Sequence, residues 1–328
     1  MKTHLPLSAL FLAVPALTGC GAPVLTPSPS SATSIAKSDA AFRFGERSRH
    51  GWLTPRARSG KRLLYVSDSA NSVVDVFDAK GHRQSPIGQI TDGINQPTGL
   101  TTDRSGNLYV ANSEVPSGYS ITVYPPGSTT PSKTYTKGLS EPVGIVVQGN
   151  GRLYVANFDG YDVTEYPKGS TTPDQTISFQ TLEGNDPYAL TLDASNDLFV
   201  AALGYPLAQA YELSRNAYTP QDLGINSIQV MHGIAVDKLG NVLIVNQGSR
   251  AIDVFSPGAT SPSKIITKGL EQPALISLNK RQDKLYAADD GVSGNGTVRV
   301  FSYPVGKLID TITFPQFAAP FGVALSPR

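Results

Sequence analysis

The sequence predicts an all-β fold, a six-bladed β-propeller, and three observations carry this prediction. A five-residue pattern of the type Leu-Tyr-Val-Ala-Asn occurs six times, with its second residue at Tyr65, Tyr109, Tyr154, Phe199, Leu243 and Tyr286. The copies are therefore 43 to 45 residues apart, which is the length of one four-stranded propeller blade. The composition is rich in turn residues, with 31 glycines and 25 prolines but only 16% charged residues. Together these features indicate one supersecondary unit repeated around an axis.

Each unit begins with an inner strand. A Pro-x-Gly-aliphatic motif, or a relic of it, precedes each pattern at residues 97–100, 142–145, 187–190, 231–234 and 273–276. Small residues in this motif let neighbouring backbones approach closely, so we expect the inner strands to pack side by side.

The remaining strands of a unit follow in order. Residues 103–107 and 237–241 have the Asp and Gly pattern of hairpin turns that lead into the second strand. A third strand alternates apolar and polar residues, as at 121–124, 163–166 and 252–255. Pro/Gly turns such as 126–131 then lead to an outer strand such as 133–136. Each unit thus contains four antiparallel strands.

The two ends of the repeat region complement each other. Residues 320–325 form a sixth inner-strand motif with no second strand after it, whereas residues 64–66 form a second strand with no inner motif before it. We therefore expect the C-terminal strand to complete the first blade, which buries both free edges. Residues 21–60 show no alternation that could supply a seventh blade.

The N-terminal region has the pattern of an export signal. Lys2 and the apolar run 5–17 predict a signal peptide over residues 1–19, because the run is too short to span a membrane. Leu17-Thr18-Gly19-Cys20 resembles the bacterial lipobox, which implies cleavage before Cys20 and acylation of its sulfur. The alternative is an ordinary secretory signal cut near Ala22. Residues 20–60 are then a flexible lipid-anchored tether, and the protein is extracytoplasmic, at the outer membrane or the cell surface.

The repeat units resemble NHL repeats, which read roughly Pro-x-Gly-Ile-Ala-Val-Asp-x-x-Gly-Asn-hydrophobic-Tyr-Val-Ala-Asp. The resemblance covers residues 61–328 and is strongest at 97–124, 142–166 and 231–255. It is weakest in the fourth unit, where Ala202 replaces the final Asn or Asp, and in the sixth, where residues 279–284 replace the turn. It implies a propeller domain over 61–328 in a superfamily that includes lactonases, lyases, oxidoreductases and plain interaction domains.

An Asn or Asp ends the repeated pattern in nearly every unit, at Asp68, Asn112, Asn157, Asn246 and Asp289. One interpretation is a ring of metal ligands. We favour a structural role, because side chains at this place can accept hydrogen bonds from backbone N–H groups of the adjoining turn.

The resemblance to family lactonases and gluconolactonases implies a calcium site on the axis, held by residues that start the inner strands. The equivalent polar positions are Gln96, Glu141, Asp186, His232 and Gln272, with Phe321 in the sixth unit. Two carboxylates and two amides could coordinate a hard cation, but the acidic pattern of the family is not reproduced. We therefore expect no metal or other cofactor, with calcium as the alternative. His232 is expected to be a packed structural residue.

The loops at the same end of the propeller form a candidate binding surface. It is rich in tyrosine and carries a few charges, a composition that suits recognition of a protein or glycan, although ordinary solvated loops are the alternative. The residues are Glu114, Tyr119, Phe158, Asp159, Tyr161, Asp162, Tyr188, Tyr205, Arg250, Asp289 and Asp290.

The sequence favours a binding scaffold over an enzyme, and no catalytic residue is assigned. The formal net charge is +1, which argues against a nucleic-acid partner. The expected partners are a protein or a glycan, with the membrane contacted only through lipidated Cys20, and the chain is expected to be a monomer. The alternative function is a calcium-dependent hydrolase or lyase of the lactonase type, with its site at the central channel.

Overall fold

The computed structural model describes residues 50–80, 85–113, 118–182, 186–204, 207–215, 217–292 and 296–327. The signal peptide, Cys20, most of the tether, Glu114 and Tyr205 lie outside the described residues, so the predictions made for them stay predictions.

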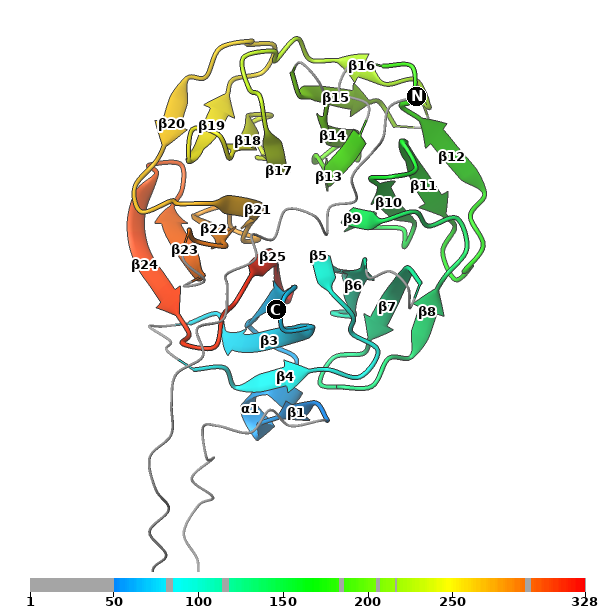
Figure 1. The fold of residues 1–328 in the computed structure, drawn as a ribbon, viewed down its shortest axis with the longest axis vertical. Helices are drawn as coiled ribbons and strands as arrows, with labels where there is room; N and C mark the ends of the chain where they lie inside the picture. The colour runs from blue at the N-terminus through cyan, green and yellow to red at the C-terminus, as the bar shows by residue number, and fades with distance from the viewer. Residues whose placement is uncertain are drawn as a thin grey trace, which may run out of the picture. The chain divides into compact units, whose positions relative to one another are not determined.

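Six antiparallel sheets are arranged around one axis, which confirms the predicted six-bladed propeller (Figure 1). Blade 1 runs from inside to outside as β25 (Pro320–Leu325), β2 (Leu63–Asp68), β3 (Val73–Asp78), β4 (Gly88–Ile90) and β1 (Trp52–Leu53). Blade 2 has β5 (Pro97–Thr102), β6 (Leu108–Asn112), β7 (Ser120–Tyr124) and β8 (Lys133–Tyr135). Blade 3 has β9 (Pro142–Val147), β10 (Leu153–Asn157), β11 (Asp162–Tyr166) and β12 (Gln175–Ser178). Blade 4 has β13 (Asp186–Leu192), β14 (Leu198–Leu203), β15 (Gln209–Leu213) and β16 (Gln221–Asp222). Blade 5 has β17 (Met231–Val236), β18 (Val242–Asn246), β19 (Ala251–Phe255) and β20 (Lys264–Ile266). Blade 6 has β21 (Pro273–Leu278), β22 (Lys284–Asp289), β23 (Thr297–Ser302) and β24 (Lys307–Thr313).

The ring is closed by the C-terminal strand, as the sequence predicts. Strand β25 pairs antiparallel with β2, with Leu325 opposite Leu64 and Ala324 opposite Tyr65. The N–H of Ser326 also donates to the carbonyl of Leu63 at 2.9 Å. Blade 1 is therefore built from both ends of the repeat region, and neither β2 nor β25 keeps an open edge on the shared side.

The second strands are buried on both faces, which explains their repeated apolar sequence. In blade 2, Leu108 and Val110 pack in a core cluster with blade 1, whereas Tyr109 and Ala111 pack in a cluster with blade 3. Alternate residues of a strand point to opposite faces, so each second strand contributes to two interfaces between blades.

The glycine of the inner-strand motif is required by close backbone contact. A Cβ added to Gly99 would lie 2.1 Å from the carbonyl oxygen of Val143, and one added to Gly322 would lie 2.4 Å from that of Thr98. Both distances are far below any tolerated contact, so the inner strands pack against each other at a separation that only glycine permits here.

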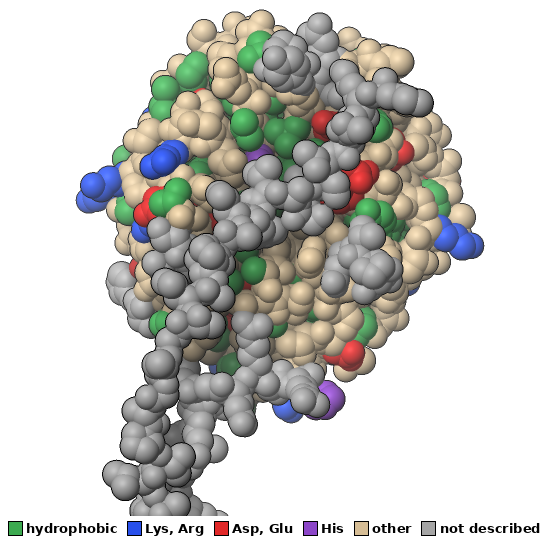
Figure 2. All heavy atoms as spheres, viewed as in Figure 1, with side chains coloured by type: hydrophobic (Ala, Val, Ile, Leu, Met, Phe, Trp, Pro, Cys, Tyr) green, Lys and Arg blue, Asp and Glu red, His purple; other side chains and the backbone are tan. Residues whose placement is uncertain are grey.

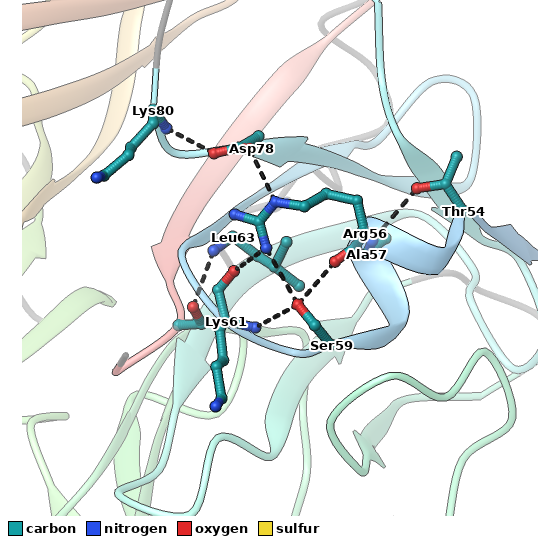
Figure 3. A network of polar contacts seen from close by, with 9 residues as sticks. Thr54, Arg56, Ala57, Ser59, Lys61, Leu63, Asp78 and Lys80 are labelled. Carbon is teal, nitrogen blue, oxygen red and sulfur yellow. Dashed lines mark hydrogen bonds and ion pairs between the residues drawn. The ribbon is translucent and has the colours of Figure 1, made fainter.

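The end of the expected tether is part of the folded domain. The sequence places the start of the propeller at residue 61, but Trp52 and Leu53 already pair with β4 as a fifth strand of blade 1. The short helix α1 (Pro55–Arg58) follows, and Thr54 caps it by accepting a hydrogen bond from the N–H of Ala57 at 3.2 Å. Its Arg56 forms an ion pair with Asp78 at 2.9 Å (Figure 3). A two-residue strand has too little alternation to stand out in the sequence, which is why the sequence shows Trp52 and Leu53 only as apolar residues.

Among the described residues, no helix combines the length and the apolar composition needed to cross a membrane.

Candidate functional site

The recurrent Asn and Asp residues cap loops within their own blades. The carboxylate of Asp68 accepts hydrogen bonds from the N–H groups of Ala318 at 2.9 Å and Ala319 at 3.1 Å, just before β25. Asn112 and Asn157 accept in the same way from the loops that precede β5 and β9. This geometry supports the structural role expected from the sequence. Within the described part of the chain, no three His, Cys, Asp or Glu side chains are grouped as a metal site.

Asp289 has the same capping role in blade 6. It is 1% exposed, and its carboxylate accepts hydrogen bonds from the N–H groups of Glu271 at 3.0 Å and Gln272 at 2.7 Å. The neighbouring Asp290 is only partly buried, so a partner would reach Asp290 more easily than Asp289.

The residue after the inner-strand proline, or after Met231 in blade 5, differs in every blade, and in three blades it is an aromatic residue at the axis. Tyr188 of β13 stacks on His232 of β17, with ring centroids 4.6 Å apart. The Tyr188 side chain also lies near Phe321 of β25, with ring centroids 6.1 Å apart. Strand β25 belongs to blade 1, which is opposite blade 4 in the propeller. Rings from opposite blades can meet only at the centre, so Tyr188, His232 and Phe321 fill the mouth of the channel. Tyr188 therefore lies on an inner strand and is 1% exposed, rather than standing in an open loop.

Figure 2 shows this end of the propeller, where a histidine, hydrophobic side chains and acidic side chains gather near the middle of the face.

His232 is held as a neutral imidazole. Its Nδ1 lies 3.0 Å from Nε2 of Gln247, and burial lowers its pKa to about 4. Burial disfavours the charged form of histidine, so the ring stays uncharged at neutral pH and stacks on Tyr188 as an aromatic group.

Glu141 and Asp159 form a carboxyl pair at the rim of the channel mouth. Glu141 precedes β9, is 7% exposed, and its carbonyl accepts a hydrogen bond from the N–H of Phe158 at 3.0 Å. Burial, followed by the charge and the hydrogen bond of Asp159, raises the pKa of Glu141 to about 7. Near neutral pH the pair therefore exchanges a proton with solvent, unlike an ordinary surface carboxylate.

Two tyrosines lie close to this pair. Burial and then the charges of Glu141 and Asp159 raise the pKa of Tyr119, which comes from the loop of blade 2. Burial and then the charges of Asp186 and Asp159 raise the pKa of Tyr161. Blades 2, 3 and 4 thus contribute one continuous group of phenols and carboxyls.

A further carboxyl, Asp290, approaches from blade 6. Burial, Asp68 and Asp289 raise its pKa to about 6. Burial and then the charges of Glu141 and Asp290 raise the pKa of Tyr188, so the two carboxyls both lie near its hydroxyl. We refer to this set as the axial cluster: Tyr119, Glu141, Phe158, Asp159, Tyr161, Asp186, Tyr188, His232, Asp290 and Phe321.

Two of the sequence-predicted residues are placed apart from the axial cluster. Gln96, just before β5 of blade 2, is exposed, and its N–H donates a hydrogen bond to Oγ of Ser72 in blade 1 at 3.2 Å. Arg250 is exposed on the loop after β18. Among the described residues, no hydrogen bond, ion pair or ring contact joins either of them to the cluster. Gln272 touches it through its carbonyl, which accepts from the N–H of Asp290 at 3.1 Å.

The sequence missed that the axis is closed by stacked rings. The usable signal was an aromatic residue directly after the inner-strand proline or Met231 in three of the blades, at Tyr188, His232 and Phe321. Chemically, the cluster can recognise a partner through rigid aromatic surface and hydrogen-bonding carboxyls, and Glu141 with Asp159 can hold or release a proton.

Comparisons with known proteins identify the fold and no family. No family model matches the chain, and no curated protein matches it in sequence. A chain in the crystal structure of a nidogen/laminin complex is similar, with a TM-score of 0.68 and 14% identity, over 80% of this chain and 98% of that chain. A protein of unknown function from Bacteroides caccae is also similar, with a TM-score of 0.63 and 10% identity, over 82% of this chain and 100% of that chain. At such low identity these similarities show a shared propeller fold and nothing finer.

Proposed function

We propose that this protein is an extracytoplasmic, lipid-anchored propeller of the NHL type that binds a protein or glycan through the axial cluster. The observation that carries the proposal is the composition of the channel mouth, where Tyr188, His232 and Phe321 form a fixed aromatic floor beside the Glu141 and Asp159 carboxyls. Aromatic side chains held rigid on a scaffold lose little conformational entropy when a partner docks, which favours binding.

Two further observations support a scaffold. The ring is closed through the pairing of β25 with β2, so loops at the channel mouth stand on a closed framework. The similar chain from the nidogen/laminin complex is named for a protein–protein assembly, which is consistent with a protein partner for this chain as well.

The test compares capture of envelope proteins and glycans by wild type and by two variants. Tyr119→Ala together with Tyr161→Ala removes two phenols from the axial cluster, whereas Leu239→Ala truncates a side chain that is 70% exposed on a turn between strands at the other end of a blade. The proposal expects a partner that is retained by wild type and Leu239→Ala and lost by the double variant. Equal capture by all three proteins would contradict it.

The lipid anchor is tested separately. Cys20→Ala should abolish incorporation of a labelled fatty acid and release the protein from the membrane fraction. Unchanged labelling would show that the anchor is elsewhere.

A hydrolase or lyase remains the second candidate, because Glu141, next to Asp159, has the raised pKa that general acid–base catalysis uses. Hydrolysis of gluconolactone is measured with added calcium and with EDTA. Activity that Glu141→Gln abolishes would favour this candidate, and calcium dependence would add the metal expected from the family resemblance.

A further inference from the structure

A polar cavity lies between blades 3 and 4, at the end of the propeller opposite the axial cluster. Its volume is about 130 Å³, and its walls include the hairpin turn that follows β9 and the loop that follows β15. Glu141 precedes β9, whereas Gln148 follows it, so the cavity and the channel mouth are at opposite ends of the same strand.

The blade-to-blade junction that holds this cavity differs from its neighbour. Between blades 2 and 3 the corresponding space is filled by Tyr135 and Tyr166, whose ring centroids are 5.2 Å apart. Between blades 3 and 4 the residue at the place of Tyr135 is Ile177, because both lie opposite the second residue of the third strand. Isoleucine also stands at this place in blades 1, 5 and 6, so the residue that sets this junction apart is Leu213, where the other five blades have Phe or Tyr. With Ile177 and Leu213 in place of two tyrosines, the space stays open.

A buried acid stands in this junction where most blades have valine. Glu165 pairs with Tyr154 across the sheet, and the residue paired with the same tyrosine position in blades 1, 2, 5 and 6 is Val76, Val123, Val254 and Val300. Glu165 is 3% exposed, and burial raises its pKa. A buried carboxylate costs stability compared with a valine, so the fold itself gives no reason for it.

Arg152 holds this acid in place. Its Nε contacts Glu165, and its Nη2 lies 2.8 Å from Asp174. The result is a fixed row of carboxylate and guanidinium groups along one wall of the cavity, a geometry that matches pairs of neighbouring hydroxyl groups.

One side-chain amide on the wall makes no hydrogen bond with any other described residue. Gln148 lines the cavity and is 8% exposed as a residue, and its amide atoms are not among the buried unsatisfied ones. The amide is therefore open to the cavity, where its oxygen can accept and its nitrogen donate hydrogen bonds to a bound molecule.

An aromatic ring and a cation lie at the rim of the cavity. Tyr218 is 47% exposed at the mouth, where its ring can cover an apolar face, and Arg215 is an exposed cation beside it. Arg152 is already paired with Glu165 and Asp174, so Arg215, which makes no ion pair with another described residue, is the cation left for an anionic ligand.

We propose that this cavity binds one carboxylated pyranose unit of a glycan. Gln148 and the Arg152–Glu165 row hydrogen-bond the ring hydroxyls, the Tyr218 ring packs on the apolar face of the sugar, and Arg215 pairs with its carboxylate. The volume is below the ~300 Å³ typical of drug-sized sites, which fits a single ring rather than an extended chain. This site is independent of the axial cluster and of the function proposed for it.

The structure has a cavity at another blade junction as well, and the two differ in their polar lining. A second cavity, of about 190 Å³, lies between blades 6 and 1, but there Val300 takes the place of Glu165. The buried acid and the unpartnered amide are what distinguish the junction of blades 3 and 4.

The experiment is a two-dimensional NMR titration of the full-length protein with three probes of similar size: methyl β-glucuronide, methyl β-glucoside and cyclohexanecarboxylate. We expect the glucuronide to saturate at millimolar concentration with shifts around Gln148, the glucoside to bind about tenfold more weakly through loss of the charged hydrogen bond, and the carboxylate alone not to saturate. Binding of cyclohexanecarboxylate as tight as the glucuronide, shifts away from the cavity, or no saturable binding would each overturn the proposal.

Variants make the test specific. Tyr218→Ala and Gln148→Leu should each weaken glucuronide binding about fivefold to tenfold, and Tyr218 is exposed enough that its truncation leaves folding intact. Lys168→Ala is the matched control, because Lys168 has the same place in blade 3 that Arg215 has in blade 4. Unchanged binding in Tyr218→Ala, or an equal loss in Lys168→Ala, would contradict the proposed site.

Discussion

Two positions at the same end of each blade differ in how much their residue varies among the blades. The residue that ends the second strand is Asn or Asp in five of the six blades, and it is occupied by hydrogen bonds to backbone groups of its own blade. The residue after the inner-strand proline, or after Met231, is different in all six blades: Thr98, Val143, Tyr188, His232, Ala274 and Phe321. In three of the blades, at Tyr188, His232 and Phe321, it is an aromatic residue at the axis.

The recurrent position contributes to the stability of every blade, whereas the variable position gives this propeller its own surface at the channel mouth. A residue that recurs from blade to blade has a structural role that the blades share, such as accepting hydrogen bonds from the backbone N–H groups of the loop before the inner strand. At the position that varies from blade to blade, Tyr188, His232 and Phe321 meet at the centre and together form one local surface. Substitutions should therefore lower stability at the recurrent positions and change binding at the variable ones.

The largest expected effect is at a recurrent glycine of the closing strand. In Gly322→Ala the new Cβ would lie 2.4 Å from the carbonyl oxygen of Thr98, a backbone atom that cannot move away alone. We expect a loss of about 3 kcal/mol in the free energy of unfolding, measured with urea, because overpacked backbone contacts force the strands apart. Ala189→Gly, at the same place in blade 4, is the control and should cost less than about 1 kcal/mol. A Gly322→Ala protein as stable as wild type would contradict this account of the motif.

A smaller effect is expected at the cap of the closing blade. Asp68 is fully buried and accepts from Ala318, Ala319 and Asn71, so Asp68→Ala leaves buried donors without partners. We expect a loss of about 2–3 kcal/mol in the free energy of unfolding. Asp68→Asn places there the residue found in blades 2, 3 and 5, and it should cost clearly less. Equal losses in the two variants would show that charge, rather than capping, is what matters at this position.

The same distinction explains what the sequence could predict. Six blades, their strand order and closure by residues 320–325 follow from repeated features, and each blade repeats the same alternation and the same turns. The caps were expected for the same reason. Repetition averages out local irregularities, so these predictions do not depend on any single residue.

The axial cluster was only partly predictable. The sequence identified all ten members of the axial cluster as separate candidates on loops and strand starts. It could not show that Tyr188 stacks on His232 or that Asp159 raises the pKa of Glu141, because these contacts join different loops and blades. The cavity between blades 3 and 4 was missed altogether, since it depends on Leu213 standing where the other blades have Phe or Tyr.

The axial cluster should give the protein a measurable pH dependence. Burial raises the pKa of Glu141 from 4.5 to about 7, so the native state binds more protons than the unfolded state in that interval. The contribution of Glu141 is fully present below about pH 4.5 and is lost as the pH rises through 7. His232, whose burial-lowered pKa is about 4, produces the opposite slope below pH 6.5 in wild type and variant alike.

Glu141→Gln isolates the contribution of that carboxyl. We expect the variant to be more stable than wild type by about 1–2 kcal/mol at pH 8, with the difference shrinking toward pH 5, as followed by urea unfolding at both pH values. Asp159→Asn is the companion variant, because removing its charge should lower the pKa of Glu141 and weaken the same slope. A difference between wild type and Glu141→Gln that does not change with pH would show that Glu141 titrates as an ordinary carboxyl.

The smallest effect on stability is expected at Arg250, an exposed loop residue. Arg250 follows the cap of blade 5, in a left-handed conformation with φ of 54°, and makes no described hydrogen bond or ion pair through its side chain. Arg250→Ala should change the free energy of unfolding by less than about 0.5 kcal/mol, because no buried group depends on it. If the loops around the channel mouth form one binding surface, the same variant should nevertheless reduce capture of the partner found with wild type. Unchanged capture would confine the binding surface to the axial cluster, because Arg250 is then an ordinary solvated loop residue.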